Sequence, residues 1–243
     1  MSETLDTFSQ TALFLVGRVA EDVSSPAVLS VLAISLLGVS SGLLAFRRND
    51  VAAAADPKVA GTARTLLYWL SLLPSVLWYV FPFLPQARFP SLYEGLSQGR
   101  TMALIVGLAG GLVFVWYGLR ALRIFRENQE ATGAAMVDFL RPSRLLVDGG
   151  YARVRHPMFL YDFLAHSGLA VAAGALTTLT LLPLYFLFSA AFNVVEERWV
   201  LAPRFGDAFD RYRARVPGYM TREGGVILSL LALGAVYLAQ WAG

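Results

Sequence analysis

The sequence predicts an all-α protein, a polytopic membrane helix bundle with about six transmembrane helices. Three observations support this fold class. First, 56% of the 243 residues are hydrophobic and only 15% are charged, which is too apolar for an ordinary soluble domain. Second, the apolar residues form segments long enough to cross a bilayer. Third, the basic residues gather in the connections on one side of these segments.

Four of the expected spans are single apolar segments of about 20 residues, the length that a hydrocarbon core of ~30 Å requires. In the third of them, Gly107, Gly110 and Gly111 would permit close contact with another helix. Residues 1–18 start acidic and predict a short amphipathic helix at the membrane interface. The four single spans are residues 26–46, 65–84, 101–119 and 225–241.

The remaining two spans are predicted as a helical hairpin over residues 157–195. This segment of 39 residues contains only two ionisable side chains, Asp162 and His166. At a rise of about 1.5 Å per residue, it suits two crossings of the membrane better than one. Gly174 and its small neighbours offer a place for the turn. A hairpin returns the chain to the side that it left, so the charged residues at its two ends are expected to face one site.

The distribution of basic residues predicts the orientation in the membrane. With the N-terminus outside, seventeen of the twenty lysines and arginines fall in cytoplasmic segments, and only Arg18, Arg88 and Arg100 do not. Such a bias follows the positive-inside rule. We therefore expect an integral membrane protein of the bacterial inner membrane, with both termini outside and the active site facing the cytoplasm.

The segment that follows the hairpin, residues 196–216, alternates charged residues with large apolar ones such as Trp199 and Phe209. This pattern predicts a cytoplasmic amphipathic helix that lies against the membrane or folds over a site. The sequence PRFG at 203–206 predicts a break in this helix.

Several classes of site are excluded by what the sequence lacks. Without cysteine there is no disulfide, thiolate nucleophile or cysteine-based metal site, and two histidines are too few for a histidine cluster, so no metal is expected. The sequence has no dinucleotide-binding glycine motif, P-loop, H-E-x-x-H or G-x-S-x-G motif. The net charge of +3 is small, and we expect no nucleic-acid partner.

Arg155-His156-Pro157 marks the start of the hairpin. Proline is well tolerated at the first position of a helix, so His156 is expected at the N-terminal edge, where free amides and the helix dipole favour an anion. Arg153 and Arg155 add positive charge, which fits a carboxylate or a phosphate. Alternatively, the two arginines only contact lipid headgroups.

Glu196-Glu197 closes the hairpin. Carboxylates are unfavourable at the negative C-terminal end of a helix and beside an anionic membrane surface, so the pair needs a cationic partner. That partner is either a bound cation or the arginines across the hairpin. Because successive helical positions point about 100° apart, one glutamate is free to bind a ligand while the other braces an arginine.

Asp162 and His166 lie four residues apart and therefore on one helix face. Ionisable groups at this depth usually face a cavity or a partner. Asp162 orients His166 as a candidate base, or the two side chains simply satisfy each other. The second interpretation is favoured.

An ordered set of motifs runs through the C-terminal third. GGYARVRHPMF at 149–159 is followed by EE at 196–197 and by FGDAFDRY at 205–212. This set resembles the integral-membrane methyltransferases, which include the isoprenylcysteine carboxyl methyltransferases and the phospholipid N-methyltransferases. Their signature is G-x-Y-x-x-x-R-H-P-x-Y, followed about forty residues later by E-E and F-G-x-x-Y-x-x-Y. The resemblance covers about residues 145–218. Phe159 and Phe209 stand where the signature has tyrosine.

The resemblance implies S-adenosylmethionine as the cofactor, in a pocket that faces the cytoplasm. It divides the single membrane domain, 1–243, into N-terminal spans (1–120), a cofactor-binding core (121–223) and a C-terminal span (224–243). Catalytic roles are expected for Arg155, Glu197, Asp162 and His166. The cofactor-binding residues are expected to be Gly150, Tyr151, Arg155, His156, Pro157, Glu196 and Glu197.

We therefore predict methyl transfer to a membrane lipid or lipid-modified substrate that carries an amine or a prenylcysteine-type carboxylate. An amine acceptor must lose a proton, which would give Asp162, His166 or a glutamate a role as base, whereas a carboxylate needs none. Two other classes stay open. One is a nicotinamide-dependent membrane reductase of the sterol-reductase type, and the other is a non-catalytic scaffold or transport component. The sequence does not predict an oligomeric state.

Overall fold

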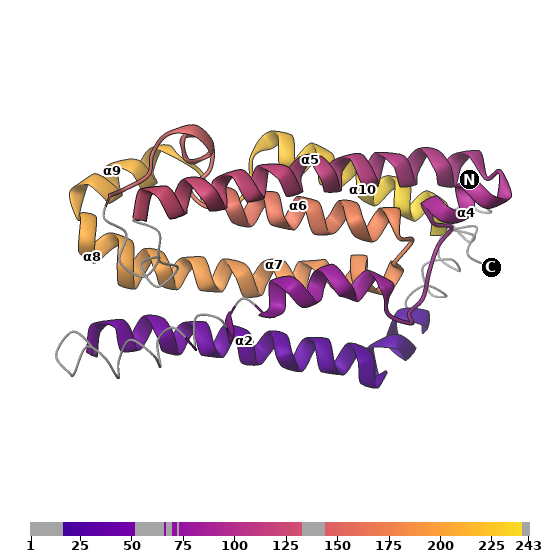
Figure 1. Ribbon diagram of the computed structural model, residues 1–243, viewed down its shortest axis with the longest axis horizontal. Coiled ribbons are helices and arrows are strands. Elements are labelled where there is room, and N and C mark those ends of the chain that lie inside the picture. Colours follow the sequence, from indigo (N-terminus) through magenta and orange to yellow (C-terminus); the bar gives the residue numbers. More distant parts are fainter. Residues whose placement is uncertain (1–16, 52–65, 67–69, 72, 133–143, 240–243) are drawn as a thin grey trace, which may run out of the picture.

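The structure is a computed structural model that describes residues 17–51, 66, 70, 71, 73–132 and 144–239 (Figure 1). Across these residues the secondary structure is helical, and the one pairing of strand type is the isolated bridge between Arg88 and Ala175. The all-α fold class is therefore confirmed. The amphipathic helix expected over residues 1–18 lies almost wholly outside the described residues.

Four of the described helices are long and apolar enough to cross a membrane, which indicates a membrane protein. The qualifying segments are Pro26–Leu44 in α2 (Pro26–Val51), Thr101–Glu130 in α5 (Thr101–Thr132), Leu176–Phe205, which begins with α7 (Leu176–Glu196), and Arg222–Ala239, which is α10. The other two expected spans correspond to shorter helices, α6 (Pro157–Ala172) and Leu73–Phe83. Most of residues 65–72 lie outside the description.

The helices lie nearly parallel to one long axis, as Figure 1 shows. Helix α6 packs along α5, α7 returns beside α6, and α10 lies against both α5 and α6. Helix α2 and the helix Leu73–Phe83 cover the other side of α7. The short helix α4 (Leu92–Gln98) precedes α5 at the far end of the bundle.

Helices α5 and α6 approach closely at two glycines. A Cβ atom on Gly110 would lie 2.7 Å from the backbone oxygen of Gly168, so neither position has room for a larger side chain. Gly107 makes a similar close contact with Leu92 of α4, whereas Gly111 faces open space. Close contact is thus confirmed for Gly107 and Gly110 and wrong for Gly111. The tight crossing fixes α6 against α5.

The turn between α6 and α7 is held by the segment that follows Phe83. Gly174 has φ +66°, a left-handed conformation that suits glycine. Phe89 N–H donates to the Gly174 carbonyl (3.0 Å), and Leu176 N–H donates to the Ala87 carbonyl (3.0 Å). Arg88 Nη1 adds a hydrogen bond to the Ala173 carbonyl (2.9 Å). This end of the helix pair is therefore pinned through backbone groups.

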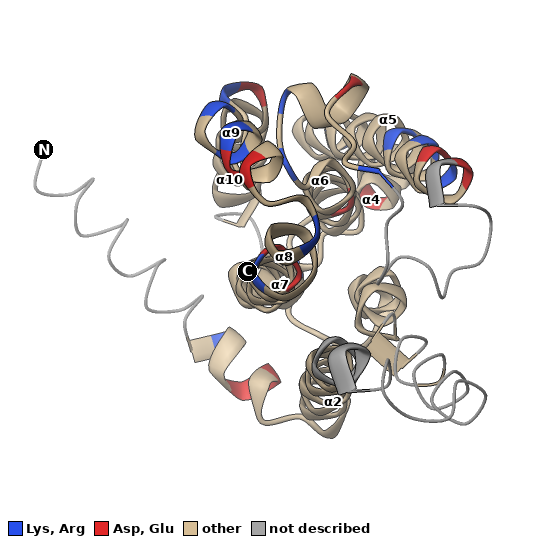
Figure 2. Ribbon diagram, turned by 90° about the vertical axis from the view of Figure 1, so that its left-hand side faces the viewer, with Lys and Arg blue, Asp and Glu red and all other residues tan. Residues whose placement is uncertain are grey.

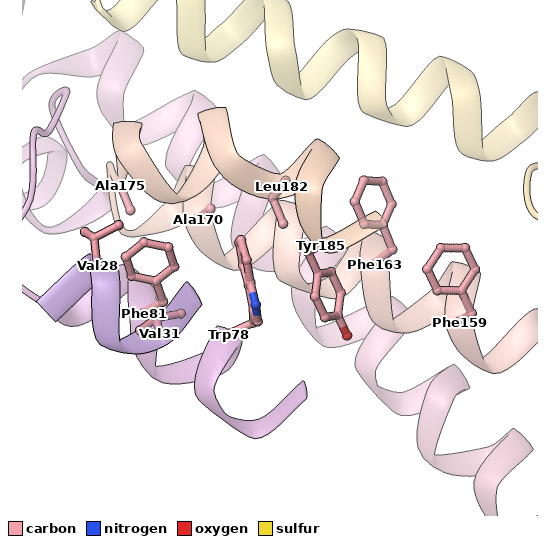
Figure 3. Packing of buried hydrophobic residues seen from close by; sticks show 10 residues of the cluster. All are labelled: Val28, Val31, Trp78, Phe81, Phe159, Phe163, Ala170, Ala175, Leu182 and Tyr185. Carbon is pink, nitrogen blue, oxygen red and sulfur yellow. The ribbon is translucent and has the colours of Figure 1, made fainter. Parts of the chain in front are cut away.

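A core of aromatic and aliphatic side chains joins α2, Leu73–Phe83, α6 and α7 (Figure 3). Trp78 and Phe81 are fully buried at its centre, with their rings at 82° to each other. The indole N–H of Trp78 donates to Ser35 Oγ on α2 (3.1 Å), so its one polar atom is satisfied.

The opposite end of the bundle faces the viewer in Figure 2, where many charged residues are seen. Here α7 continues through a π-helical turn, Glu197–Leu201, into α8 (Ala202–Phe205). Gly206, with φ +48°, then separates α8 from α9 (Asp207–Arg215). In α9 the side chains of Phe209 and Tyr212 are buried. The buried face of α9 is thus turned toward the segment that precedes α6, where the Tyr212 hydroxyl meets the Tyr151 carbonyl.

Candidate functional site

His156 occupies the N-cap of α6, and Pro157 takes the first helical position, where its missing N–H costs nothing. The backbone just before the helix is held by a second segment. Arg155 N–H donates to the Pro217 carbonyl (2.8 Å), and His156 N–H donates to the Gly218 carbonyl (3.2 Å). These bonds hold the chain in place just before the first turn of α6.

Glu197 is the centre of the polar contacts at this end of the bundle. Its Oε1 atom lies 2.8 Å from Arg155 Nε and 2.8 Å from His156 Nε2. The side chains of Arg155 and Glu197 are 14% and 10% exposed. Glu197 begins the π-helical turn, a distortion that often marks functional positions in helices. One carboxylate therefore orients the Arg155 guanidinium and the His156 ring from across the helix pair.

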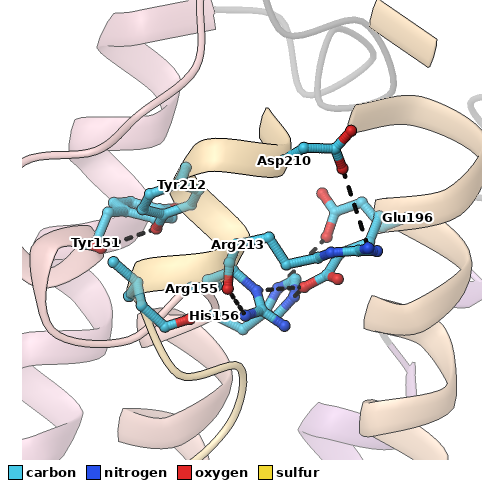
Figure 4. A network of polar contacts seen from close by, with 9 residues as sticks. Tyr151, Arg155, His156, Glu196, Asp210, Tyr212 and Arg213 are labelled. Atoms are coloured by element: carbon cyan, nitrogen blue, oxygen red, sulfur yellow. Dashed lines mark hydrogen bonds and ion pairs between the residues drawn. The ribbon is translucent and has the colours of Figure 1, made fainter. Parts of the chain in front are cut away.

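Glu196 is held more loosely than its neighbour. Its Oε2 atom lies 3.7 Å from His156 Nδ1, beyond hydrogen-bond distance, and its side chain is 26% exposed. Figure 4 shows Glu196 beside Arg155 and His156 in the same network. The two glutamates thus differ in the way that helix geometry predicts, with Glu197 bracing and Glu196 available.

Arg155 also ties the network to the end of α9. Its Nη1 atom donates to the carbonyl oxygens of Val216 (2.6 Å) and Arg213 (3.1 Å). Gly218 has little room beside this guanidinium, because a Cβ atom there would lie 3.0 Å from Arg155 Nη2. The guanidinium is therefore fixed on three sides, and α9 cannot move without breaking these bonds.

Tyr151 and Gly150 hold the segment that leads into α6 against α5. The Tyr151 hydroxyl donates to Asn128 Oδ1 (2.6 Å), and Gly150 fits closely between Ile124 and Pro157. The Tyr212 hydroxyl of α9 donates to the Tyr151 carbonyl (2.8 Å), as drawn in Figure 4.

Burial raises the pKa values of the Tyr151 and Tyr212 hydroxyls. The pKa of Tyr212 rises to about 12, and that of Tyr151 rises well above its ordinary value. Both hydroxyls therefore stay protonated at neutral pH and act as hydrogen-bond donors.

Aromatic rings pack against one another beside the network. The ring of Tyr219 stacks on His156, with centroids 5.4 Å apart and planes 10° apart. Phe159 of α6 and Phe186 of α7 meet at 5.1 Å, and Phe159 also meets Tyr219 edge-on at 6.0 Å. Burial raises the pKa of Tyr219 as well. We call Phe159, Phe186 and Tyr219 the aromatic wall.

Asp162 and His166 belong to a different cluster, deeper along α6. Asp162 follows His156 by six residues, or about 9 Å of helix. Its carboxylate accepts from Tyr79 (2.7 Å), from Ser75 (3.2 Å) and from Tyr185.

Both ring nitrogens of His166 also have partners, and its side chain is only 1% exposed. Its two nitrogens face the carbonyl oxygens of Asp162 (2.8 Å) and Ser75 (3.2 Å), and Nδ1 lies 3.4 Å from the Asp162 carboxylate. Since both carbonyls only accept, both bonds form when the ring is doubly protonated, and the carboxylate of Asp162 balances that charge.

A groove lies between α5 and α10, near the same end of the bundle. It has a volume of about 440 Å³, and its lining is almost entirely apolar. At its polar end, Glu223 accepts from the Tyr117 hydroxyl (2.9 Å) and lies 3.9 Å from Arg153. The guanidinium of Arg120 lies 4.7 Å above the Trp116 ring. The groove is lined by Leu112, Val113, Val115, Trp116, Tyr117, Leu119, Glu223 and Ile227.

Of the predicted site residues, the structure brings Arg155, His156, Glu196 and Glu197 together. It places Tyr151, Gly150 and Pro157 beside them as supports and leaves Asp162 and His166 in the deeper cluster. Sequence reasoning missed Tyr219, whose ring stacks on His156. No group of three metal-binding side chains occurs among the residues that the structure describes.

Comparisons of the chain with protein-family models, with curated proteins and with solved structures gave no match.

Proposed function

We propose that this protein is an integral-membrane methyltransferase that uses S-adenosylmethionine to methylate a lipid-borne acceptor. One observation carries the proposal. The two charged motifs at the ends of α6 and α7 meet in one cluster, with Glu197 2.8 Å from both Arg155 and His156. This cluster joins the motifs through which the sequence resembles membrane methyltransferases.

The donor set fits the proposed cofactor. The partly exposed carboxylate of Glu196 suits the cofactor's ammonium group or ribose hydroxyls, and the cationic side of the cluster suits its carboxylate. When bound, S-adenosylmethionine supplies an electrophilic methyl group, whose bond to the sulfonium sulfur breaks as a bond to the acceptor's nitrogen or oxygen forms. The chain then has to position the acceptor in line and exclude water, which a small set of polar residues can do.

The proposed orientation places the charged end of the bundle in the cytoplasm of a bacterial cell, with six spans and both termini outside. In this arrangement α6 and the helix Leu73–Phe83 complete the spans, and α9 lies at the cytoplasmic surface. Charged residues concentrated on α8, α9 and the end of α5 support this assignment (Figure 2).

The groove between α5 and α10 is the proposed seat for the hydrocarbon chain of the acceptor. Both helices are long and apolar enough to span, so the groove opens toward lipid. Its volume of about 440 Å³ falls within the usual range for ligand pockets. Glu223 and Arg153 at its polar end would hold a headgroup near the cytoplasmic face, on the side of α6 that carries Tyr161.

Calorimetry of the detergent-purified protein with S-adenosylhomocysteine tests the cofactor. We expect binding by the wild-type protein and by Val194→Leu, a change on an exposed face of α7. Binding of NADPH in place of S-adenosylhomocysteine would instead identify a reductase. Binding of neither would favour a scaffold or transport component.

Incubation with lipid extract and methyl-labelled cofactor tests the acceptor. We expect label in a lipid fraction, and Ile227→Trp, which fills the groove, should raise KM for the lipid several-fold while cofactor binding stays unchanged. An unchanged KM would contradict the role of the groove.

A further inference from the structure

Asn193 is the one described residue whose buried side-chain donor has no partner. Its Nδ2 atom makes no hydrogen bond, although the residue is only 9% exposed. A buried amide without a partner costs free energy, and such groups in native proteins call for an explanation. We propose that Asn193 and the aromatic wall form the subsite that recognises the adenine base of the cofactor. This inference rests on the proposed function.

Helix geometry aims Asn193 at the candidate site. It precedes Glu197 by four residues and follows Phe186 by seven, so the three side chains lie along one stripe of α7. Both neighbours on this stripe face α6, because Glu197 contacts His156 and Phe186 contacts Phe159 at 5.1 Å. Helical side chains lean toward the N-terminus of their helix, so the amide lies between Glu197 and Phe186.

The side chains around Asn193 have the chemistry to bind a purine. Phe159, Phe186 and Tyr219 offer ring faces and edges to a flat aromatic base. An asparagine amide matches adenine in a two-point contact, in which its carbonyl accepts from the exocyclic amine and its N–H donates to a ring nitrogen. The carboxylates one turn away remain for groups that donate hydrogen bonds. The unpaired N–H of Asn193 would then be satisfied only in the bound state.

Titration calorimetry with two ligands tests the assignment. S-adenosylhomocysteine carries the full base, and S-inosylhomocysteine has a carbonyl where adenine has its amine. We expect the wild-type protein to prefer the adenosyl compound by about tenfold or more, the scale of one good two-point contact. Asn193→Leu, of similar volume, should weaken binding of the adenosyl compound by a similar factor and abolish the preference. Val194→Leu is the matched control and should keep both.

A stability measurement separates recognition from a structural role. Because leucine leaves no unpaired donor, Asn193→Leu without ligand should have the same melting temperature as the wild-type protein or a higher one. Addition of S-adenosylhomocysteine should raise the melting temperature of Asn193→Leu by less than that of the wild-type protein. Unchanged affinity in Asn193→Leu would show that the amide meets only water and would overturn the inference. Equal loss for both ligands, with the preference retained, would overturn the base assignment. No binding by the wild-type protein would overturn the proposed function and this inference together.

Discussion

Two clusters on α6 combine a histidine with a carboxylate, yet they are built differently. At the start of the helix, His156 and Arg155 share Glu197, and Glu196 stays partly exposed beside them. Six residues further on, Asp162 accepts from three other side chains, and the ring of His166 is enclosed. In the first cluster, the carboxylate of Glu196 makes only the 3.7 Å contact with His156. In the second cluster, both oxygens of the Asp162 carboxylate accept hydrogen bonds. Residue type alone therefore does not identify a site, because spare capacity for hydrogen bonds decides which cluster can take a ligand.

The largest expected effect comes from breaking the deeper cluster. Asp162→Ala would leave the hydroxyls of Tyr79 and Tyr185 without this acceptor and would remove the carboxylate that lies 3.4 Å from the His166 ring. We expect a loss of about 3–5 kcal/mol in the free energy of unfolding, the scale for breaking a buried pair. Thermal unfolding in detergent measures it.

A double-mutant cycle with His166→Gln serves as the control for Asp162→Ala. The two changes should be non-additive by about 0.5–3 kcal/mol, as expected for residues in one network. Full stability of Asp162→Ala, together with lost methyl transfer, would instead mean that Asp162 acts in the reaction.

The two glutamates provide a matched pair that sharpens the comparison. Glu197→Gln removes the shared carboxylate, so we expect the protein to lose about 1–3 kcal/mol of stability and at least tenfold in affinity for S-adenosylhomocysteine. Glu196→Gln should lower that affinity by about tenfold while stability changes by no more than about 0.5 kcal/mol. Calorimetry and thermal unfolding of both variants separate the roles. Equal losses of stability in the two variants would contradict the assignment of a bracing role to Glu197 and a binding role to Glu196.

The smallest expected effect concerns Tyr212. Tyr212→Phe removes one hydrogen bond to the Tyr151 carbonyl and should cost about 0.5–1.5 kcal/mol. Burial raises the pKa of Tyr212 from 10.0 to about 12, so the bound proton favours the folded state. This contribution is complete below about pH 10 and is lost as the pH rises toward 12. Unfolding of both proteins from pH 7 to 11.5 should show the difference narrowing above pH 10. A constant difference would contradict the role of the hydroxyl.

The meeting of Arg155 and His156 with the glutamates could be predicted from the sequence. A proline at the start of one apolar stretch and a glycine near its middle favour a helix pair whose ends return to one place. Which glutamate braces could not be predicted, because adjacent helical positions differ by about 100° and the rotation of α7 depends on packing against α2 and α6.

Other features depend on contacts between distant segments. Asp162 meets Tyr79 and Tyr185 from two other helices, and no spacing in the sequence pairs them. The sequence predicted a span ending at 119, whereas α5 continues to Thr132. Its added residues are mostly good helix formers such as Arg123, Glu127 and Gln129, so the helix extends past the point where hydropathy falls.

The backbone bonds at Gly174 have a mechanical consequence. They anchor one end of the α6–α7 pair, while the other end is joined through side chains of Arg155, His156 and Glu197. Separating the two helices at the charged end requires only that these side-chain contacts break, whereas separating them at the turn requires the loss of backbone hydrogen bonds to a second segment. The α6–α7 pair is therefore built to open, if it opens, at the end where the cofactor is proposed to bind.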